Sequence, residues 1–443
     1  MTGRPASAPL ARVADSPLGF DRLTKKSAIC LVVDGLHAGF LGALGNSWVR
    51  TPTFDRLASQ SLLLDTAIVD RADLGHLGSA YWQGRHALVD DDAGSTSTPL
   101  AAQLNELGVS SILLTDDRQV AEHPAATFAE SIVLPVEAAS DAAADLDQTQ
   151  LARFFAAAIE VVEQASQPAL VWLHTRGLFL PWDAPLAMRE EYRDEEDPDA
   201  LATSAVPDRT LSADHDPDEL VQIVHAYAAQ VAVLDACLGM FLESLDRGPF
   251  AETAMVNVLG ARGFPLGEHL VIGGQQELVY GESLQVPWML RLPDRTAAAT
   301  RTTALVQPAD LFATLVDWFE LPEQAAPTFL SDSLLKLCAV DPTWNRDRAC
   351  SLGSQDQWSI RTDAWFLRGE QRPQGESRPQ VAGELFVKPD DRFEQNEVAA
   401  RCGEIVELLT AAFAEFQQFA SGAPDAPRGD LPALDARLTG DRF

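Results

Sequence analysis

The stretch Leu31–Val69, LVVDGLHAGFLGALGNSWVRTPTFDRLASQSLLLDTAIV, decides the fold class of this chain. Its first residues continue the apolar run SAICLVVDG, which ends in Asp34 and Gly35. A continuous apolar run closed by glycine is typical of a strand buried on both faces of a parallel sheet. A glycine-rich turn follows, and the segment TPTFDRLA predicts a helix beginning near Thr51.

Further along the chain, helical and strand patterns alternate. Residues 98–117 and 145–177 each read as a helix followed by a buried strand, with Asp and Thr at the start of the second helix. Residues 217–247 predict a long amphipathic helix, and the strand TAMVNVLG comes next. Alternation of this kind favours an α/β fold with a doubly wound, mostly parallel sheet flanked by helices.

Changes in composition divide the chain into segments. Residues 1–26 read as a flexible N-terminal lead-in, and residues 27–335 as the α/β domain. Within that domain the acidic, Pro-containing stretch 183–219 is interpreted as a surface loop. Residues 336–420 predict a smaller C-terminal subdomain with an antiparallel sheet and a helix, and 421–443 a tail.

The net charge of the chain disfavours some classes of binding partner. The 443 residues include 65 acidic and 33 basic side chains, giving a formal net charge of −32. Such an excess repels phosphate backbones and anionic lipid heads, so nucleic acid and membrane partners are disfavoured. Neither a signal peptide nor a membrane span is expected, and the five scattered cysteines predict a reducing, cytoplasmic location. The sequence leaves open whether the protein is a homo-oligomer.

Several motifs together resemble the sulfatase family of the alkaline-phosphatase-like superfamily, over about Ser27 to Leu409. The motifs are the opening stretch, YWQGRHAL (81–88), FPLGEH (264–269), GESLQVPWMLRLP (281–293), ALVQPADLFATLVDWFEL (304–321) and GELFVKPDDRFEQNEVA (383–399). The resemblance implies acidic residues at strand ends that hold a divalent cation, usually calcium. It also implies a formylglycine nucleophile made from Cys or Ser, with Arg, Lys and His stabilising the developing charge.

The catalytic positions of that family are replaced in this chain. Two adjacent aspartates should end the first strand, but Asp34 is followed by Gly35. The nucleophile position falls on Leu74, which cannot be converted into formylglycine, and its Pro and Arg partners become His76 and Gly78. A shift of one residue places Asp73 there, but a carboxylate is not the nucleophile of this family.

Other family positions are lost as well. The resemblance places Asp116 and Arg118 at a Lys and His block, Phe179 at a histidine, Ala261 and Arg262 at a metal-binding pair, and Gly273 or Gly274 at a lysine. We therefore predict no catalytic residue, no metal site and no cofactor. The vestigial pocket would comprise Asp34, Asp73, His76, Asp116, Arg118, Phe179, Arg262 and His269.

Arg262 suggests how the single surviving ligand position is accommodated. Its guanidinium could neutralise Asp34 through a bidentate pair, because a buried unpaired carboxylate is costly. The alternative is a metal site rebuilt with Asp70, Asp73, Asp116 or Asp117, since calcium takes six to eight oxygen ligands. His76 and His269 are interpreted as residues that stabilise turns, with a base or ligand role as the alternative.

These replacements predict a pseudoenzyme with a sulfatase-like fold and a binding, scaffolding or regulatory role. Its partner would be an unknown protein or small molecule. The alternative is a hydrolase of sulfate or phosphate esters with a rewired site and one divalent metal, calcium or another. A third hypothesis is an obligate partner of an active homologue, because a shared fold does not secure a shared function.

Overall fold

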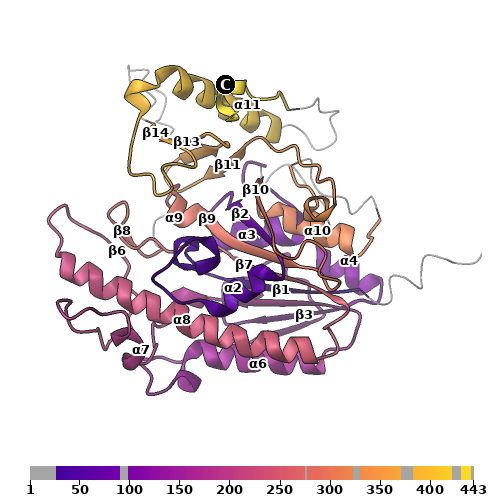
Figure 1. Ribbon diagram of the computed structural model, residues 1–443. Helices are drawn as coiled ribbons and strands as arrows, with labels where there is room; N and C mark the ends of the chain where they lie inside the picture. Colours follow the sequence, from indigo (N-terminus) through magenta and orange to yellow (C-terminus); the bar gives the residue numbers. More distant parts are fainter. Residues whose placement is uncertain are drawn as a thin grey trace, which may run out of the picture.

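The computed structural model describes residues 26–89, 98–274, 277–322, 330–370, 383–421 and 431–440. A large twisted sheet occupies the centre, helices cover both of its faces, and a smaller sheet with a helix lies at one side (Figure 1). This arrangement confirms the predicted fold class. The part of the prediction that concerns residues 1–25 lies outside the described residues.

The central sheet has the strand order β10-β2-β9-β7-β1-β5-β3-β4. All of its strands run in one direction except β9, which pairs antiparallel with both β2 and β7. The carboxyl ends of the parallel strands therefore meet at one edge of the sheet. The strands are β1 (Ser27–Val33), β2 (Leu62–Ile68), β3 (Ser110–Thr115), β4 (Glu130–Val133), β5 (Ala169–Thr175), β7 (Ala254–Gly260), β9 (Gln285–Arg291) and β10 (Thr300–Val306).

The run SAICLVV forms β1, and every residue of it is buried. It lies between β5 and β7, so each neighbour supplies a parallel ladder of backbone hydrogen bonds. A strand covered by helices on both faces has no polar side, which explains why its sequence is continuously apolar rather than alternating. The strand carries Asp34 to the carboxyl edge of the sheet.

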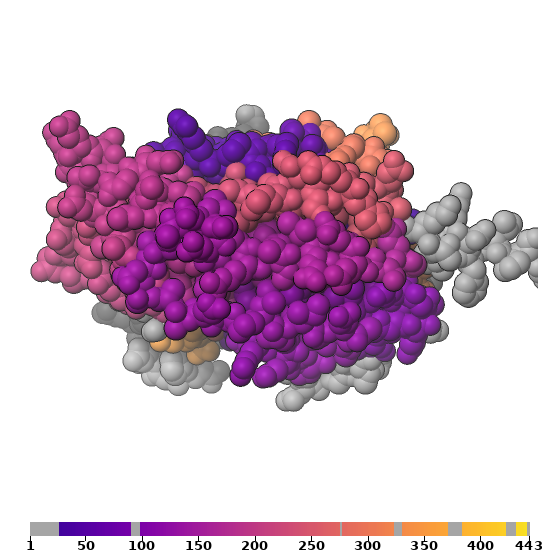
Figure 2. Space-filling model, turned by 90° about the horizontal axis from the view of Figure 1, so that it is seen from below, coloured from indigo at the N-terminus to yellow at the C-terminus, as the bar shows by residue number. Residues whose placement is uncertain are grey.

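Two layers of helices enclose the sheet. One layer contains α2 (Pro52–Ser59), α6 (Gln150–Gln164) and α8 (Pro217–Arg247), and Figure 2 views the molecule from below, the side of α6 and α8 in Figure 1. The other contains α3 (Leu74–Gln83), α4 (Leu100–Glu106) and α10 (Ala309–Trp318). The predicted start signal of α6 is confirmed, because the Thr149 side chain accepts a hydrogen bond from the Ala152 N–H. Short helices α5 (Arg118–Ala121), α7 (Leu186–Glu190) and α9 (Gly281–Leu284) complete the unit.

Helix α8 is long and apolar enough to cross a membrane by length and composition, which the sequence analysis did not anticipate. In the fold, 72% of its most apolar window is buried. It packs along α6 and beside α2. This is the environment of a core helix in a globular domain.

The C-terminal subdomain contains an antiparallel sheet of β11 (Ala349–Leu352), β12 (Gln357–Arg361), β13 (Trp365–Glu370) and β14 (Glu384–Val387). Helix α11 (Gly403–Ala420) covers this sheet through its own hydrophobic cluster. Part of the predicted tail is built into this cluster, since Leu438 is buried and the Trp365 Nε1–H donates to the Arg437 carbonyl.

Two predicted segment limits differ from the structure in detail. Leu334 and Leu337 lie in the core of the α/β domain, and Arg346 binds Asp310 of α10, so that domain continues past residue 335. The acidic stretch 183–219 contains α7 and the two-residue strand β6 (Arg209–Thr210), which pairs with β8 (Val271–Ile272). It also buries Arg189, whose guanidinium binds backbone carbonyls of the same stretch.

Gly177 holds the turn after β5 against the end of β1. Its φ is +52°, and a Cβ there would lie 2.5 Å from the Asp34 carbonyl oxygen. Gly177→Ala should therefore combine backbone strain with overpacking and lower the free energy of unfolding by about 3 kcal/mol. Gly108→Ala is the matched control, because Gly108 also has a positive φ but open space around it. If urea unfolding gave the same loss of unfolding free energy for both variants, the close approach of Gly177 to the Asp34 carbonyl would be contradicted.

Candidate functional site

Polar side chains from several strands meet at the carboxyl edge of the sheet. His174 is the penultimate residue of β5. The other residues come directly after strands or within two residues of their ends: Asp34 after β1, Asp70 after β2, Asp116 after β3 and Arg262 after β7. In an open α/β sheet this edge is where ligands bind. The bonds that each side chain makes decide what the site can do.

Asp34 and Arg262 form the predicted bidentate pair. The Arg262 Nε–H donates to Asp34 Oδ1 at 2.9 Å, and its Nη2–H donates to Oδ2 at 3.1 Å. Asp34 Oδ1 also accepts the Gly35 N–H at 3.0 Å. Both carboxylate oxygens are thus engaged, and Asp34 is almost completely buried. The predicted bidentate contact of Arg262 with Asp34 is present.

The rest of the guanidinium is also held. Its Nη1–H donates to the Ala72 carbonyl at 3.2 Å, and its carbon lies 4.5 Å from the centre of the Phe179 ring. Phe179 packs in turn against Phe264, at a centroid distance of 5.0 Å. A flat cation over an aromatic face gains electrostatic attraction that strengthens as water is excluded. Arg262 therefore has one fixed orientation.

Burial and pairing oppose each other at this pair. Burial raises the pKa of Asp34, and the charge and hydrogen bonds of Arg262 counter that rise. Burial also disfavours the guanidinium cation, but Asp34 more than offsets this, and the pKa of Arg262 is raised. Removing either partner would leave a buried charge without compensation.

The former nucleophile position is part of a helix start. Leu74 is the first residue of α3 and lies in the core. Asp73 caps this helix, accepting the His76 N–H at 2.9 Å. The His76 Nε2 lies 3.2 Å from Asp70 Oδ2, which also accepts the Ala87 N–H at 2.8 Å. Asp73 and His76 therefore have structural partners.

The end of β3 provides two aspartates that are also committed to backbone bonds. Asp116 accepts the Thr175 Oγ1–H at 2.7 Å and the Arg176 N–H at 2.6 Å, which ties β3 to β5. Burial raises the pKa of Asp116 to about 6, although these bonds oppose the rise. Asp117 caps α5, whereas Arg118 is exposed. Arg118 is predicted to belong to the pocket around Asp34, but its side chain is exposed in the structure.

His174 is the least satisfied polar group at this edge. It is buried, and among the described residues neither ring nitrogen has a hydrogen-bond partner. Burial lowers the pKa of His174 to about 4, with smaller effects from Asp117 and Arg262. The ring is therefore neutral at neutral pH. The Trp172 Nε1 and the Tyr81 hydroxyl are also buried without a partner in the described structure.

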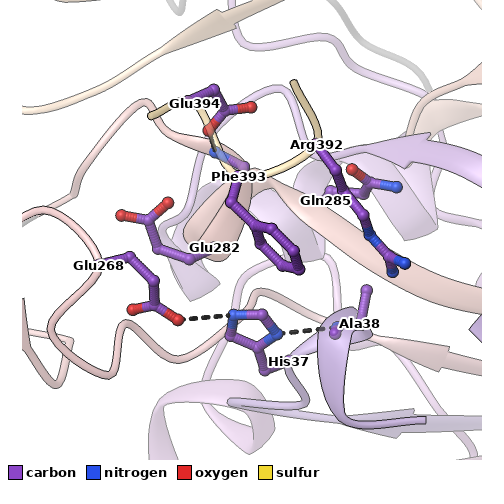
Figure 3. A pocket seen from close by; sticks show the side chains of 10 residues that line it. His37, Ala38, Glu268, Glu282, Gln285, Arg392, Phe393 and Glu394 are labelled. Carbon is purple, nitrogen blue, oxygen red and sulfur yellow. Dashed lines mark hydrogen bonds and ion pairs between the residues drawn. The ribbon is translucent and has the colours of Figure 1, made fainter. Parts of the chain in front are cut away.

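A separate cleft lies where the α/β domain meets the C-terminal subdomain (Figure 3). Its volume is about 350 Å³ with the adjoining open solvent included, and the Phe393 ring projects into its centre above His37. The Gly39 N–H donates to His37 Nδ1 at 2.8 Å, so the remaining ring proton is on Nε2, which faces Glu268 at 3.1 Å. His37 thereby fixes the turn that follows β1.

His269 bonds to two residues that line this cleft, Glu282 and Glu394. Its Nδ1 lies 2.7 Å from Glu282 Oε1, and its Nε2 lies 3.1 Å from the Glu394 carbonyl. Burial lowers the pKa of His269, but the carboxylate of Glu282 outweighs this and the net shift is upward. Lys388 binds Glu394 at 2.6 Å. The predicted pocket groups His269 with Asp34, but in the structure the GEH turn places His269 against Glu282 and against Glu394 of the C-terminal subdomain.

Sequence reasoning missed the acidic partners of these histidines. Glu282 is 13 residues from His269, and Glu394 is 125 residues away. No local spacing connects residues so far apart. The motifs GEH, GESL and DDRFE did contain them, but only the docking of the two sheets shows that they meet.

Replacing Arg262 tests the central pair. Arg262→Met should lower the free energy of unfolding by about 3–5 kcal/mol, because Asp34 would remain buried without its cation. The loss should shrink in acid, where Asp34 takes up a proton. Urea unfolding at neutral and acidic pH measures both effects.

Two variants control for this result. Arg247→Met removes an exposed ion pair with Glu243 and should cost less than about 0.5 kcal/mol. The double variant Asp34→Leu/Arg262→Met removes both charges and should recover part of the loss. Equal stabilities of Arg262→Met and Arg247→Met would contradict the role of the pair.

The buried neutral His174 should make stability depend on pH. Its pKa is about 4 in the folded protein and 6.5 as the ordinary value, so the unfolded chain binds the extra proton between these limits. The contribution is complete above pH 6.5 and declines by about 3 kcal/mol as the pH falls towards 4. His174→Phe should flatten this slope, and His215→Phe, at the surface, should leave it unchanged. If the free energy of unfolding of His174→Phe depended on pH as steeply as that of the wild type, other titratable groups would be responsible for the dependence.

Solved structures with the same fold include several enzymes. The structure titled as BT4656 in complex with its substrate D-glucosamine-2-N,6-O-disulfate has a TM-score of 0.70 and 14% identity, covering 91% of this chain and 100% of that one. The phosphonate monoester hydrolase of Agrobacterium radiobacter has a TM-score of 0.67 and 17% identity, covering 89% and 95%. BT1596, a 2-O GAG sulfatase, has a TM-score of 0.68 and 14% identity, covering 94% and 96%.

Identities this low establish the fold alone. No curated protein matches the chain in sequence. The sulfatase family model matches residues 26–321, which is more than half of the chain. The strand that presents Asp34, the helix that starts at Leu74 and the GEH turn all lie inside this match. The chain therefore belongs to the sulfatase family.

Proposed function

We propose that this chain is a sulfatase-family protein that has lost hydrolytic activity and acts by binding a protein or small-molecule partner. The observation that carries the proposal is the bidentate pair between Arg262 and Asp34. In this interpretation the guanidinium has taken over the charge-neutralising role of a divalent cation. A fixed organic cation keeps the fold intact without supplying a metal-bound nucleophile.

The residues around Asp34 fit a guanidinium better than calcium. Calcium takes six to eight oxygen ligands, whereas both oxygens of Asp34 already accept hydrogen bonds from Arg262. Asp73 and Asp116 are bound to backbone N–H groups. Among the described residues, no group of three or more His, Cys, Asp or Glu side chains is arranged to hold a metal.

The nucleophile position supports the same proposal. Leu74 has an aliphatic side chain, and its packing in the core leaves no reactive atom at the start of α3. The neighbouring Asp73 uses its carboxylate to cap the helix. Family chemistry needs an activated nucleophile at this point. The structural bonds of the strand-end residues favour a role in stability.

Metal content and hydrolysis test the proposal directly. Protein equilibrated with calcium, magnesium, manganese and zinc should retain no stoichiometric metal in elemental analysis. Its melting temperature should be the same with and without chelator. It should not hydrolyse 4-nitrophenyl sulfate, 4-nitrophenyl phosphate or phenyl phosphonate esters. One tightly held metal per chain, with hydrolysis that Asp34→Ala abolishes, would instead support an ester hydrolase with a rewired metal site.

Restoring the family's ligand pair provides a second test. The double variant Ala261→Asp/Arg262→Asn places oxygen ligands beside Asp34 and removes the hydrogen bonds of Arg262 from both carboxylate oxygens. Calcium should then raise the melting temperature, because a ligand that binds only the folded state stabilises it. The stabilisation at 100 times the Kd would be about 2.7 kcal/mol.

The wild type and Asp34→Ala/Ala261→Asp/Arg262→Asn are the controls for that variant. Neither should respond to calcium, since the first keeps the guanidinium and the second lacks the strand-end carboxylate. A calcium response in the wild type, or none in the restored variant once it is shown to fold, would contradict the proposed replacement of the cation by Arg262.

A further inference from the structure

A groove on the α8 side of the molecule is lined by residues that the strand-end site does not use. It encloses about 1280 Å³, part of it open to solvent. Its lining residues come from the loop before α2, from the first turn of α2, from the two residues after α7 and from α8, and Figure 1 shows where these helices lie. The lining residues are Trp48, Arg50, Pro52, Thr53, Glu191, Tyr192, Ala232, Asp235 and Ala236.

An indole held by other aromatic rings forms one wall of the groove. Trp48 is 43% exposed, which is high for this residue type. Tyr192 contacts it edge to face at a centroid distance of 5.2 Å, and His225 lies at 5.7 Å. Phe40 lies behind, at 6.4 Å. These contacts fix the orientation of the ring, so a ligand stacking on Trp48 would lose little side-chain entropy.

Small residues on α8 leave the floor of the groove open. Ala232 and Ala236 are one helical turn apart and lie on the same face. Asp235 lies between them, and its carboxylate accepts the N–H groups of Thr53 and Phe54 at 2.9–3.1 Å. This bond holds α2 at a fixed distance from α8. The opening is therefore a built feature of the helix packing.

The rim of the groove has charges of both signs. Arg50 and Glu191 are exposed, and within the described residues neither forms an ion pair with another side chain. Together they provide several N–H donors and two carboxylate acceptors beside the indole. The combination of a flat apolar face with donors and acceptors at its margin suits a ring that is apolar on one face and hydroxylated at its edge.

We propose that this groove binds a neutral oligosaccharide, with one sugar ring stacked on Trp48 and its hydroxyls bonded to Arg50 and Glu191. An anionic sugar fits less well, because the lining contains two carboxylates to one guanidinium and the whole chain has a net charge of −32. The groove contains none of the residues around Asp34. Its occupancy is therefore independent of whether the chain hydrolyses esters.

Calorimetric titration with defined oligosaccharides tests the proposal. The probes are neutral hexasaccharides of α- and β-linked glucose, mannose, xylose, galactose and N-acetylglucosamine, with a chondroitin sulfate hexasaccharide as the anionic comparison. At least one neutral probe should bind saturably with a Kd of about 1 mM or tighter. Trp48→Ala should weaken this binding about tenfold or more, and Ala236→Trp should abolish it by filling the floor.

Phe393→Ala is the matched control, because Phe393 is another exposed aromatic residue, 51% accessible, outside the groove. It should bind the same probe as tightly as the wild type. Arg50→Ala/Glu191→Ala changes only exposed side chains and provides a second test if Trp48→Ala does not fold. Binding to no neutral probe, preference for the anionic probe, or equal binding by the wild type and both groove variants would overturn the proposal.

Discussion

The buried carboxylate of Asp34 is the constraint on which the site depends. The central strand β1 ends there, and its hydrophobic neighbours remove the water that would otherwise solvate the charge. A buried carboxylate needs a cation with matching geometry, and Arg262 supplies one through two hydrogen bonds. Phe179 covers the guanidinium, and Gly177 allows the turn bearing that ring to approach the end of β1.

The pairing of Asp34 with a guanidinium has different consequences from the coordination of a metal ion. A divalent cation binds several oxygens and leaves positions for water or substrate, whereas a guanidinium donates hydrogen bonds along fixed directions in one plane. Two other acidic residues at the edge are satisfied separately, Asp73 at the start of α3 and Asp116 between β3 and β5. The frame of the family is thus compatible with a strand edge that is held by paired side chains.

Two other regions have features that the strand edge lacks. Glu282 and Glu394, which line the cleft between the subdomains, are paired with His269 and Lys388, so charged side chains bonded to each other join the two subdomains there. The groove beside Trp48 is the opposite case, because Arg50 and Glu191 are exposed on its rim and α8 contributes two alanines beside the buried Asp235. A satisfied charge network stabilises an interface, while unfilled space beside a fixed aromatic ring favours a ligand.

The sequence by itself determined the α/β class, the central strand, the capped helix α6 and the family, because these depend on local apolar runs, helix signals and motif order. It also predicted that Arg262 meets Asp34, since the family resemblance places both residues at positions of metal ligands. Only the tertiary structure decided that His269 joins Glu282 and Glu394, that residues 431–440 include part of the core, and that Trp48 lines a groove. Those contacts arise from packing between elements far apart in the chain, for which neither periodicity nor spacing holds information.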